Sequence, residues 1–548
     1  MTNFEASAVN ARLGKGPLLT RLFGKPHTPL RISAVPRDHV VGDKTRGESL
    51  LAGKFLLGTD MVSLPDVDFA DLGTSGALAA DFHGFSWLRD VAAAAARERG
   101  SRLAEAVVGR WLLTHGEKVD DAWAPALWGE RMLFWTAYAP YILSSRDADY
   151  RSAVLHTMAR GARHLSSTAD QADPGLPRIT AWAGLTVAGL LLQGGLGRVA
   201  RAEAGLTRAL ASAQSEDGGL LSRSPHEQAL LVDRLGLTRA AYFAAKQTLP
   251  DSLESAAAAA LSALHGVTLG DSALSSWQGG NPGDPVRLAA LIDGCGLRAR
   301  PLRAARGWGY HRLSALGTVL TVDAGAPPPA RMTRCASAST LAFEMSDGAQ
   351  RLVINCGGPG PLPGTIPDDL ARALRSTAAH STLTLGDTNS TAILPDGSLG
   401  KGVDDVTVTR TDDDNASRIE ASHEGYVRGF GLTHARSITL GNDGKEVRGV
   451  DRLAAKGRKK IRESAPYAIR FHLQPGVEAV ATADGMGAIL RSPGAPPWNF
   501  RCRGAQLQLE ESVSVDGSAH LRGTTQIVVV GEVSHLGAEI GWHFRRSS

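Results

Sequence analysis

The chain is poor in cysteine, and its cysteines are not paired at the spacing of a metal or redox motif. The 548 residues contain four, Cys295, Cys335, Cys356 and Cys502, and no CxxC pair occurs. Disulfide-stabilised proteins and structural zinc clusters need several cysteines at short, regular spacings. We therefore expect isolated reduced thiols, and neither a disulfide framework nor a zinc cluster.

Long hydrophobic runs are also absent. Leu18, Leu19, Leu22 and Phe23 lie among basic residues near the N-terminus, but glycine and proline interrupt them. They are too short and too broken for a signal peptide or for a membrane-spanning helix. The sequence therefore predicts a protein without a membrane span that stays in the cytoplasm.

Neither sign of charge is in large excess. Lys and Arg number 59 and Asp and Glu 55, so the formal net charge is +4, and both signs are mixed along the chain. A nucleic-acid-binding protein concentrates its basic residues on one element, so we expect no nucleic-acid partner. GxxxxGK[ST], HExxH and GxSxG motifs do not occur, and no GxGxxG convincingly follows a strand. These absences exclude phosphate-loop, dinucleotide, zincin and α/β-hydrolase chemistry as leading ideas.

Residues 61–300 have the periodicity of helices. Apolar residues recur at i, i+3 and i+4, and short Gly, Pro and Asp breaks separate the segments. Many successive helices joined by short turns imply a bundle, a solenoid or a toroid. Their lengths vary without a fixed period, which argues against an ordinary repeat array. The expected helices are Trp87–Arg99, Arg102–Leu113, Ala126–Leu143, Tyr150–Leu165, Ile179–Leu192, Val199–Ala213 and His226–Gln247.

Residues 301–548 have the pattern of strands joined by Asp-Gly turns, which favours a large antiparallel β-sandwich. With residues 1–60 as an N-terminal extension, this makes an all-α domain followed by an all-β domain. A groove at their junction would be a natural ligand site. The expected strands are Thr318–Asp323, Leu341–Met345, Arg351–Asn355, Ser381–Leu385, Val406–Arg410, Arg418–His423, Ser437–Leu440, Ile469–Leu473 and Gln526–Val530.

Histidine, arginine and tyrosine recur on or beside these strands. Their polar atoms need partners, so their spacing suggests a polar face that lines a groove and suits an anionic ligand. A histidine or tyrosine there could also act as an acid or a base. The residues of this set are Arg375, His380, His423, Tyr426, His434, Arg470 and His472.

The helical half offers two further groups. Trp128, Glu130 and Arg131 could contact a sugar ring and its carboxylate, although aromatic residues at helical spacing are more often part of a core. Arg223 follows a glycine turn and precedes Ser224-Pro225, where Ser224 can cap a new helix. A helix start beside an arginine attracts anions.

Several of these segments together resemble the heparinase II/III-like family of polysaccharide lyases, especially a bacterial branch of it. They cover most of the chain from about residue 80 onward. The matching segments are Phe82-His-Gly-Phe-Ser-Trp-Leu-Arg-Asp90, Asp217-Gly-Gly219, Arg223-Ser-Pro225, Gly309-Tyr-His-Arg-Leu313, Leu341-Ala-Phe-Glu-Met-Ser346, Val353-Ile-Asn-Cys-Gly357, Thr377-Ala-Ala-His-Ser-Thr-Leu383, His423-Glu-Gly-Tyr426 and Arg470-Phe-His-Leu473.

The resemblance implies an (α/α) toroid joined to an antiparallel β-sandwich, with an acidic polysaccharide bound between them. It also implies β-elimination at a uronic acid, in which one side chain neutralises the carboxylate and others move protons. Arg223, Arg375 or His380 could do the first, and Tyr426, Tyr310 or His423 the second. Lyases of this type are usually exported, so a periplasmic location is the alternative.

The chain departs from this family where relatives hold a metal ion and a base. Cys335-Ala-Ser337 stands where relatives have His-x-His, and Asn355 replaces a carboxylate, so only His380 remains and we expect no metal cofactor. Glu227-Gln228 replaces a Tyr-His pair.

Three functions stay open. The first is a lyase that cleaves a uronate-containing polysaccharide. The second is a catalytically degenerate carbohydrate-binding protein in exopolysaccharide or envelope biogenesis. The third is a hydrolase with a carboxylate pair drawn from Glu130, Asp217 and Glu227.

Overall fold

The chain divides into a helical unit and a unit that holds both large β-sheets. The computed structural model describes residues 30–57, 60–64, 69, 77–360, 366–456, 464–534 and 537–547. The helical unit extends to Gln214 and adds Leu230–Ala258 and Ala289–Arg298. The β unit comprises Ser215–Ala229, Ala259–Leu288 and the chain from Ala299 onward. The apolar residues 18–23 lie outside the described residues, and the domain boundaries near residues 60 and 300 stay predictions.

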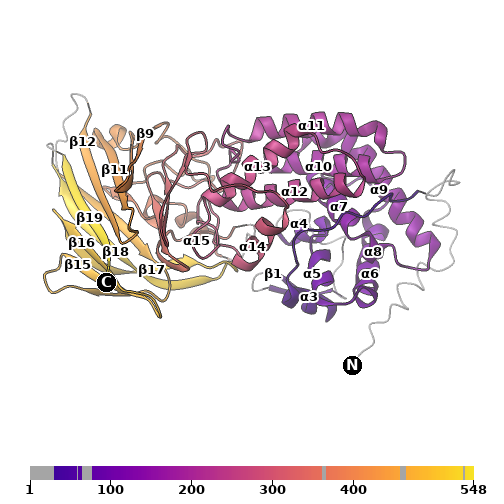
Figure 1. Ribbon diagram of the computed structural model, residues 1–548, viewed down its shortest axis with the longest axis horizontal. Coiled ribbons are helices and arrows are strands. Elements are labelled where there is room, and N and C mark those ends of the chain that lie inside the picture. The colour runs from indigo at the N-terminus through magenta and orange to yellow at the C-terminus, as the bar shows by residue number, and fades with distance from the viewer. Residues whose placement is uncertain are drawn as a thin grey trace. The chain divides into compact units, whose positions relative to one another are not determined.

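Helices make up most of the chain from Lys44 to Gly294 (Figure 1), as the periodicity of the sequence predicts, and one hairpin, β1 (Lys54–Leu57) and β2 (Asp60–Ser63), follows the first of them. Asp147 begins one of them by accepting hydrogen bonds from the backbone of Asp149 and Tyr150, an N-cap that satisfies donors the helix leaves free. The helices are α3 (Lys44–Leu51), α4 (Ala77–Gly84), α5 (Leu88–Ala94), α6 (Arg97–His115), α7 (Pro125–Ala137), α8 (Ala139–Ile142), α9 (Ala148–Thr168), α10 (Leu176–Leu191), α11 (Val199–Ala213), α12 (Pro225–Ala244), α13 (Asp251–Gly266) and α14 (Pro285–Gly294).

Two helices predicted as continuous are broken in the structure. The predicted helix Trp87–Arg99 is wrong in its length because Ala95 is extended, with φ −147° and ψ 153°, and ends α5. The predicted helix Ala126–Leu143 divides after Ala137, just before Pro140, whose nitrogen cannot donate a helical hydrogen bond. The helix predicted over Val199–Ala213 is confirmed at both ends.

Two glycines let α7 and α10 approach until their backbones touch. A Cβ atom at Gly184 would lie 2.4 Å from the Cα of Gly129, and one at Gly129 would lie 2.2 Å from the carbonyl oxygen of Thr180. Both distances are far shorter than a carbon contact allows. The backbone of one helix therefore occupies the place of a side chain on the other.

We expect Gly184→Ala to lower the free energy of unfolding by about 1–3 kcal/mol, because the added methyl group forces rigid backbones apart. Chemical denaturation of both variants measures the change. Gly197→Ala is the matched control, since a Cβ there meets nothing within 4 Å. Equal stability of the two variants would contradict the close approach.

The β unit contains two large antiparallel sheets. One has the strand order β14-β15-β16-β19-β12-β11-β10-β9, and the other the order β17-β18-β13-β7-β6-β5-β4-β3, with β8 paired to β13. The strands are β3 (Ala304–Ala305), β4 (Tyr310–Ala315), β5 (Thr318–Asp323), β6 (Phe343–Asp347), β7 (Gln350–Ile354), β8 (Leu383–Leu385), β9 (Val406–Asp412), β10 (Ala416–His423), β11 (Leu432–Gly441), β12 (Glu446–Ala455), β13 (Ala465–Leu473), β14 (Glu478–Ala481), β15 (Gly487–Arg491), β16 (Trp498–Arg503), β17 (Gln506–Val515), β18 (Leu521–Val533) and β19 (Ala538–Arg546).

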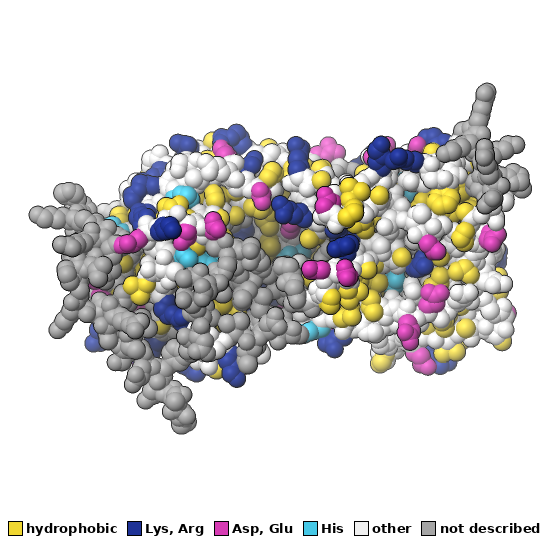
Figure 2. Space-filling model, turned by 180° about the vertical axis from the view of Figure 1, so that it is seen from behind, with side chains coloured by type: hydrophobic (Ala, Val, Ile, Leu, Met, Phe, Trp, Pro, Cys, Tyr) yellow, Lys and Arg dark blue, Asp and Glu magenta, His cyan; other side chains and the backbone are white. Residues whose placement is uncertain are grey.

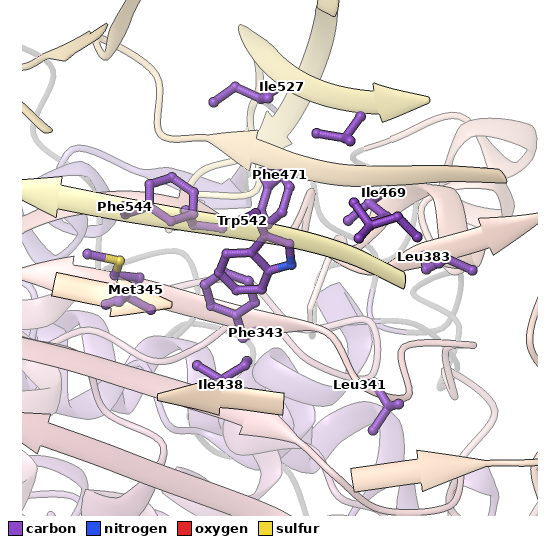
Figure 3. Close-up of a cluster of buried hydrophobic side chains, with 14 of the residues drawn as sticks. Leu341, Phe343, Met345, Leu383, Ile438, Ile469, Phe471, Ile527, Trp542 and Phe544 are labelled. Atoms are coloured by element: carbon purple, nitrogen blue, oxygen red, sulfur yellow. The ribbon is translucent and has the colours of Figure 1, made fainter. Parts of the chain in front are cut away.

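One hydrophobic core joins the two sheets (Figure 3). Trp542 of β19, in the first sheet, stacks on Phe343 of β6, in the second, with ring centroids 5.4 Å apart. Phe471 of β13 meets the edge of the same indole at 5.0 Å. Side chains from facing sheets that fill one interior define a β-sandwich. The predicted all-β domain is therefore confirmed.

Two global properties agree with the composition. Within the described ranges, no helix combines the length and the apolar character needed to cross a bilayer. On the face drawn in Figure 2, Lys and Arg side chains are interspersed with Asp and Glu wherever side chains are shown.

Candidate functional site

His423 and His434 belong to a hydrogen-bonded chain inside the β unit. They face each other across β10 and β11, and the Nε2 atom of His423 lies 3.4 Å from the Nδ1 atom of His434. The His434 Nε2 atom lies 2.7 Å from Asp451, which also accepts two hydrogen bonds from Arg436. The backbone of Gly425 donates to the Nδ1 atom of His423, so the proton of His423 is on Nε2 and points to His434. His434 in turn donates from Nε2 to Asp451, so each ring carries one proton.

These two imidazoles do not line an open groove. His423 is 2% exposed and His434 0%, and burial lowers the pKa of both rings, so they are neutral. The expectation of a solvent-facing polar surface is wrong for them because Gly425 and Asp451 supply their hydrogen-bond partners from inside the protein. Their roles in catalysis or binding stay predictions.

The other predicted proton-transfer groups are also engaged with the protein. His380 bonds the carbonyl of Ser376 at 2.7 Å, and burial lowers its pKa to about 4. The hydroxyl of Tyr426 donates to Leu383, and that of Tyr310 donates to Arg223. Burial raises the pKa of both tyrosines, which is opposite to the shift a tyrosine base needs.

His472 and Arg470 lie on β13. His472 bonds Ser512 through Nδ1 at 2.8 Å and the carbonyl of Ala378 through Nε2 at 2.9 Å, so both ring nitrogens have partners. Arg470 donates to the hydroxyl of Thr384 at 2.7 Å and is half-buried.

Arg223 ties the segment before α12 to strands β4 and β5. Its guanidinium donates to the carbonyls of Trp308 and Ala326 and to Asp323, and it lies 4.6 Å from the ring centre of Tyr310. Burial alone would lower the pKa of Arg223, but Asp323 more than compensates and the pKa is raised. The arginine is therefore a charged group with its counterion already in place.

The residues predicted from α7 lie in the helical unit, and two of them are core residues. Arg131 is 0% exposed, between Trp111 at 4.0 Å and Trp128 at 4.5 Å, and it donates to the carbonyl of His83. The expectation that Trp128 and Arg131 contact a sugar is wrong in this structure, because their faces are covered by other side chains. Glu130 accepts a hydrogen bond from Arg234 at 2.6 Å.

The residues at the predicted metal position fit an ion poorly. The amide oxygen of Asn355 accepts from the backbone of Ser381, and its nitrogen donates to Glu344. Ser337 offers only a hydroxyl, so His380 is left as a single strong donor, which is too few for zinc. Among the described residues, the one group of three possible ligands is Asp38, His39 and Asp233, and Arg89 already bonds both of its carboxylates.

Arg375 stands out because its charge is not neutralised. It donates to the carbonyls of Ala336 at 2.7 Å and Gly397 at 2.6 Å, and among the described residues no carboxylate forms an ion pair with it. The exposed thiol of Cys335 and the guanidinium of Arg372 interact electrostatically with Arg375, and the carboxyl of Glu227 interacts with Cys335. Burial raises the pKa of Glu227, and a hydrogen bond with Ser222 acts in the opposite direction.

We call Glu227, Cys335 and Arg375 the Arg375 cluster. The sequence predicts Arg375 as a ligand-binding residue, Cys335 as a lost histidine, and Glu227 as a candidate hydrolase carboxylate that follows the Ser224 helix cap. The cap exists, since the backbone of Glu227 donates to Ser224 at 3.3 Å. A guanidinium that no carboxylate neutralises suits an anionic ligand.

Comparison with known proteins identifies the family. The model of the family "Heparinase II/III-like, C-terminal" matches residues 297–543. FtsZ-localized protein C of Caulobacter vibrioides is 30% identical over 539 residues, which are 95% of this chain and 91% of that protein. This chain belongs to the heparinase II/III-like family.

Solved structures agree with this assignment at the level of the fold. A heparinase III structure matches with a TM-score of 0.70 at 12% identity, covering 99% of this chain and 89% of that one. A heparan sulfate lyase HepC mutant from Pedobacter heparinus matches with a TM-score of 0.62 at 13% identity, covering 92% of this chain and 82% of that one. A chondroitin AC lyase from Streptomyces coelicolor matches with a TM-score of 0.53 at 12% identity, covering 99% of this chain and 83% of that one. The predicted order of a helical domain and a β-sandwich is confirmed.

Proposed function

We propose that this chain is a heparinase II/III-like protein that binds an acidic saccharide at the Arg375 cluster without cleaving it. One observation carries the proposal. The four residues predicted to move protons are buried, and each is hydrogen-bonded to the protein through a ring nitrogen or its hydroxyl, whereas no carboxylate among the described residues pairs with Arg375.

Elimination at a uronate needs a base that reaches the sugar and is deprotonated. Tyr310 and Tyr426 are each 2% exposed and donate their hydroxyl protons to carbonyls. His380 bonds the carbonyl of Ser376 through Nδ1. Both tyrosines hold the proton that a base must lack, and this supports binding better than turnover.

Binding and cleavage are separated by one experiment. We expect the purified protein to bind a uronate oligosaccharide, and to form no ultraviolet-absorbing C4–C5 double bond when incubated with uronate polymers. Appearance of that absorbance at a rate proportional to the protein concentration would establish the lyase hypothesis instead.

Arg375→Gln should weaken saccharide binding about tenfold or more, because a charge-assisted hydrogen-bond pair to a carboxylate is lost. Isothermal titration measures the affinity. Arg372→Gln is the matched control, since it removes the same charge from an exposed position on the neighbouring helix α15 (Asp368–Ala373). Equal affinities for the two variants would reject the Arg375 cluster as the binding site.

We propose in addition that the chain acts at the cell-division site. FtsZ-localized protein C supports this, because its similarity extends over 95% of this chain at 30% identity, whereas the lyase structures are 12–13% identical. A fluorescent fusion should gather at the division plane of dividing cells. Uniform fluorescence would contradict a location at the division site. A periplasmic signal would contradict the predicted cytoplasmic location.

A further inference from the structure

A cavity of about 400 Å³ lies within the β unit, apart from the Arg375 cluster. Its apolar lining includes Leu221, Val406, Val408 and the run Pro327–Pro329. Three consecutive prolines have fixed φ angles, so this wall is stiff before any ligand arrives. The polar lining includes Arg223, Arg306, His311 and Asp405. The family resemblance gives a predicted role only to Arg223, which is already paired with Asp323.

His311 is the unusual member of the lining. It lies on β4 and is 1% exposed, yet neither ring nitrogen has a hydrogen-bond partner among the described residues. His380 and His472, which are buried to the same degree, bond the protein through their rings. A buried polar group without a partner is unfavourable, so an unpaired imidazole beside a cavity points to a ligand that completes it.

The surroundings of His311 define what that ligand offers. Burial lowers the pKa of His311 to about 4, and Arg410, Arg306 and Arg223 act in the same direction. The ring is therefore neutral near pH 7 and presents one donor and one acceptor. A ligand hydroxyl, which both donates and accepts, matches such a ring.

The positive charges around the cavity differ in what they already bind. Arg223 is paired with Asp323, and Arg410 is bonded to Asp412. Arg306 is exposed, and among the described residues no carboxylate forms an ion pair with it. It is thus the cation of the lining that can take an anionic group, while Asp405 can accept hydrogen bonds from hydroxyls.

We infer that this cavity binds a small hydroxylated anion, a molecule of about one sugar ring that carries a single carboxylate or phosphate. Arg306 takes the anionic group, His311 and Asp405 bond hydroxyls, and the apolar wall packs on the carbon face of the ligand. The volume lies within the usual range of small-molecule sites, about 300–1,000 Å³. This site does not depend on the Arg375 cluster.

Isothermal titration of the full chain with four probes tests the site. Glucuronate and glucose 6-phosphate present the two possible anions on a hydroxylated ring, glucose lacks the anion, and inorganic phosphate lacks the ring. We expect one or both hydroxylated anions to bind at least about tenfold more tightly than glucose and than phosphate. If glucose bound as tightly as the hydroxylated anions, Arg306 would not contribute to binding. If inorganic phosphate bound as tightly, the hydroxyl contacts would not contribute.

Three variants assign the binding to this cavity. Arg306→Gln should weaken the tighter probe about tenfold or more, and His311→Phe should weaken it while keeping a ring of similar size. Arg300→Gln removes another exposed arginine, which does not line the cavity, and should leave affinity unchanged. Because Arg306 is exposed, its variant folds, and unchanged affinity in Arg306→Gln would overturn the inference even if binding elsewhere persists. Arg375→Gln should not affect this affinity, which keeps the two sites distinguishable.

Discussion

Asp451→Ala should destabilise the protein by about 3–5 kcal/mol, because it removes one partner of a buried ion pair and leaves the other uncompensated. Asp451 is 0% exposed on β12. It accepts hydrogen bonds from His434 at 2.7 Å, from Arg436 at 2.8 and 3.0 Å, and from the indole nitrogen of Trp542 at 2.8 Å. Arg436 and the other two donors would lose this acceptor in the interior of the sandwich.

Chemical denaturation followed by tryptophan fluorescence measures this loss. The matched control is Glu539→Ala on β19, which removes a carboxylate bonded to Arg452 where both side chains are about 60% exposed. Exposed pairs contribute about 0–1 kcal/mol, so this control should hardly change stability. A similar effect of the two substitutions would show that the Asp451 network is not a buried support of the sheet.

The parts of the fold that the sequence predicts are those with a strong local period. The strand Thr318–Asp323 is confirmed residue for residue, and all of its residues are buried. The strand β14 was not predicted, because Glu478–Ala481 is short and mostly exposed and lacks an apolar alternation. Its pairing with β15 comes from the register of the sheet and not from its own residues.

The site was harder to predict because the partners of its charged residues are remote in sequence. Asp323 lies 100 residues after Arg223, and Asp451 lies 17 residues after His434 on the next strand. A histidine with a buried partner and a histidine that faces a groove have the same local pattern. Only the pairing of β11 with β12 distinguishes them, and that pairing is a tertiary property.

His311 has no predicted role, although the structure leaves its ring without a hydrogen-bond partner among the described residues. The sequence predicts no strand at Gly309-Tyr-His-Arg-Leu313, and the family resemblance gives a role only to Tyr310 of this segment. The structure gives Tyr310 a backbone partner and leaves the imidazole of His311 without one. Hydrogen-bond satisfaction, which a sequence does not reveal, therefore decides which of two neighbouring residues is available to a ligand.

Acidification from pH 7 to pH 5 should lower the stability of the β unit by roughly 2 kcal/mol for each buried neutral imidazole whose pKa falls from about 6.5 to about 4 or below. Burial lowers the pKa of His311 and His380 to about 4 and that of His472 to about 3. The unfolded chain then binds protons that the folded chain does not. Stability is therefore full above pH 6.5 and is lost as the pH falls through that value.

Buried glutamates act in the opposite direction and must be separated from this effect. Burial raises the pKa of Glu130 and Glu344, so the folded state takes up their protons first as the pH falls. A stability curve of the unmodified protein contains both contributions. A variant that removes one imidazole shows how much that imidazole contributes to the pH dependence of stability.

His472→Gln is the most informative such variant, because glutamine can still donate and accept in place of a ring bonded to Ser512 and Ala378. Unfolding free energies of both proteins should be measured by denaturation at pH 7 and pH 5. The variant should lose roughly 2 kcal/mol less between the two pH values than the unmodified protein. The same loss in both proteins would mean that the imidazole of His472 is protonated in the folded state, and hence that the site around Ala378 admits water.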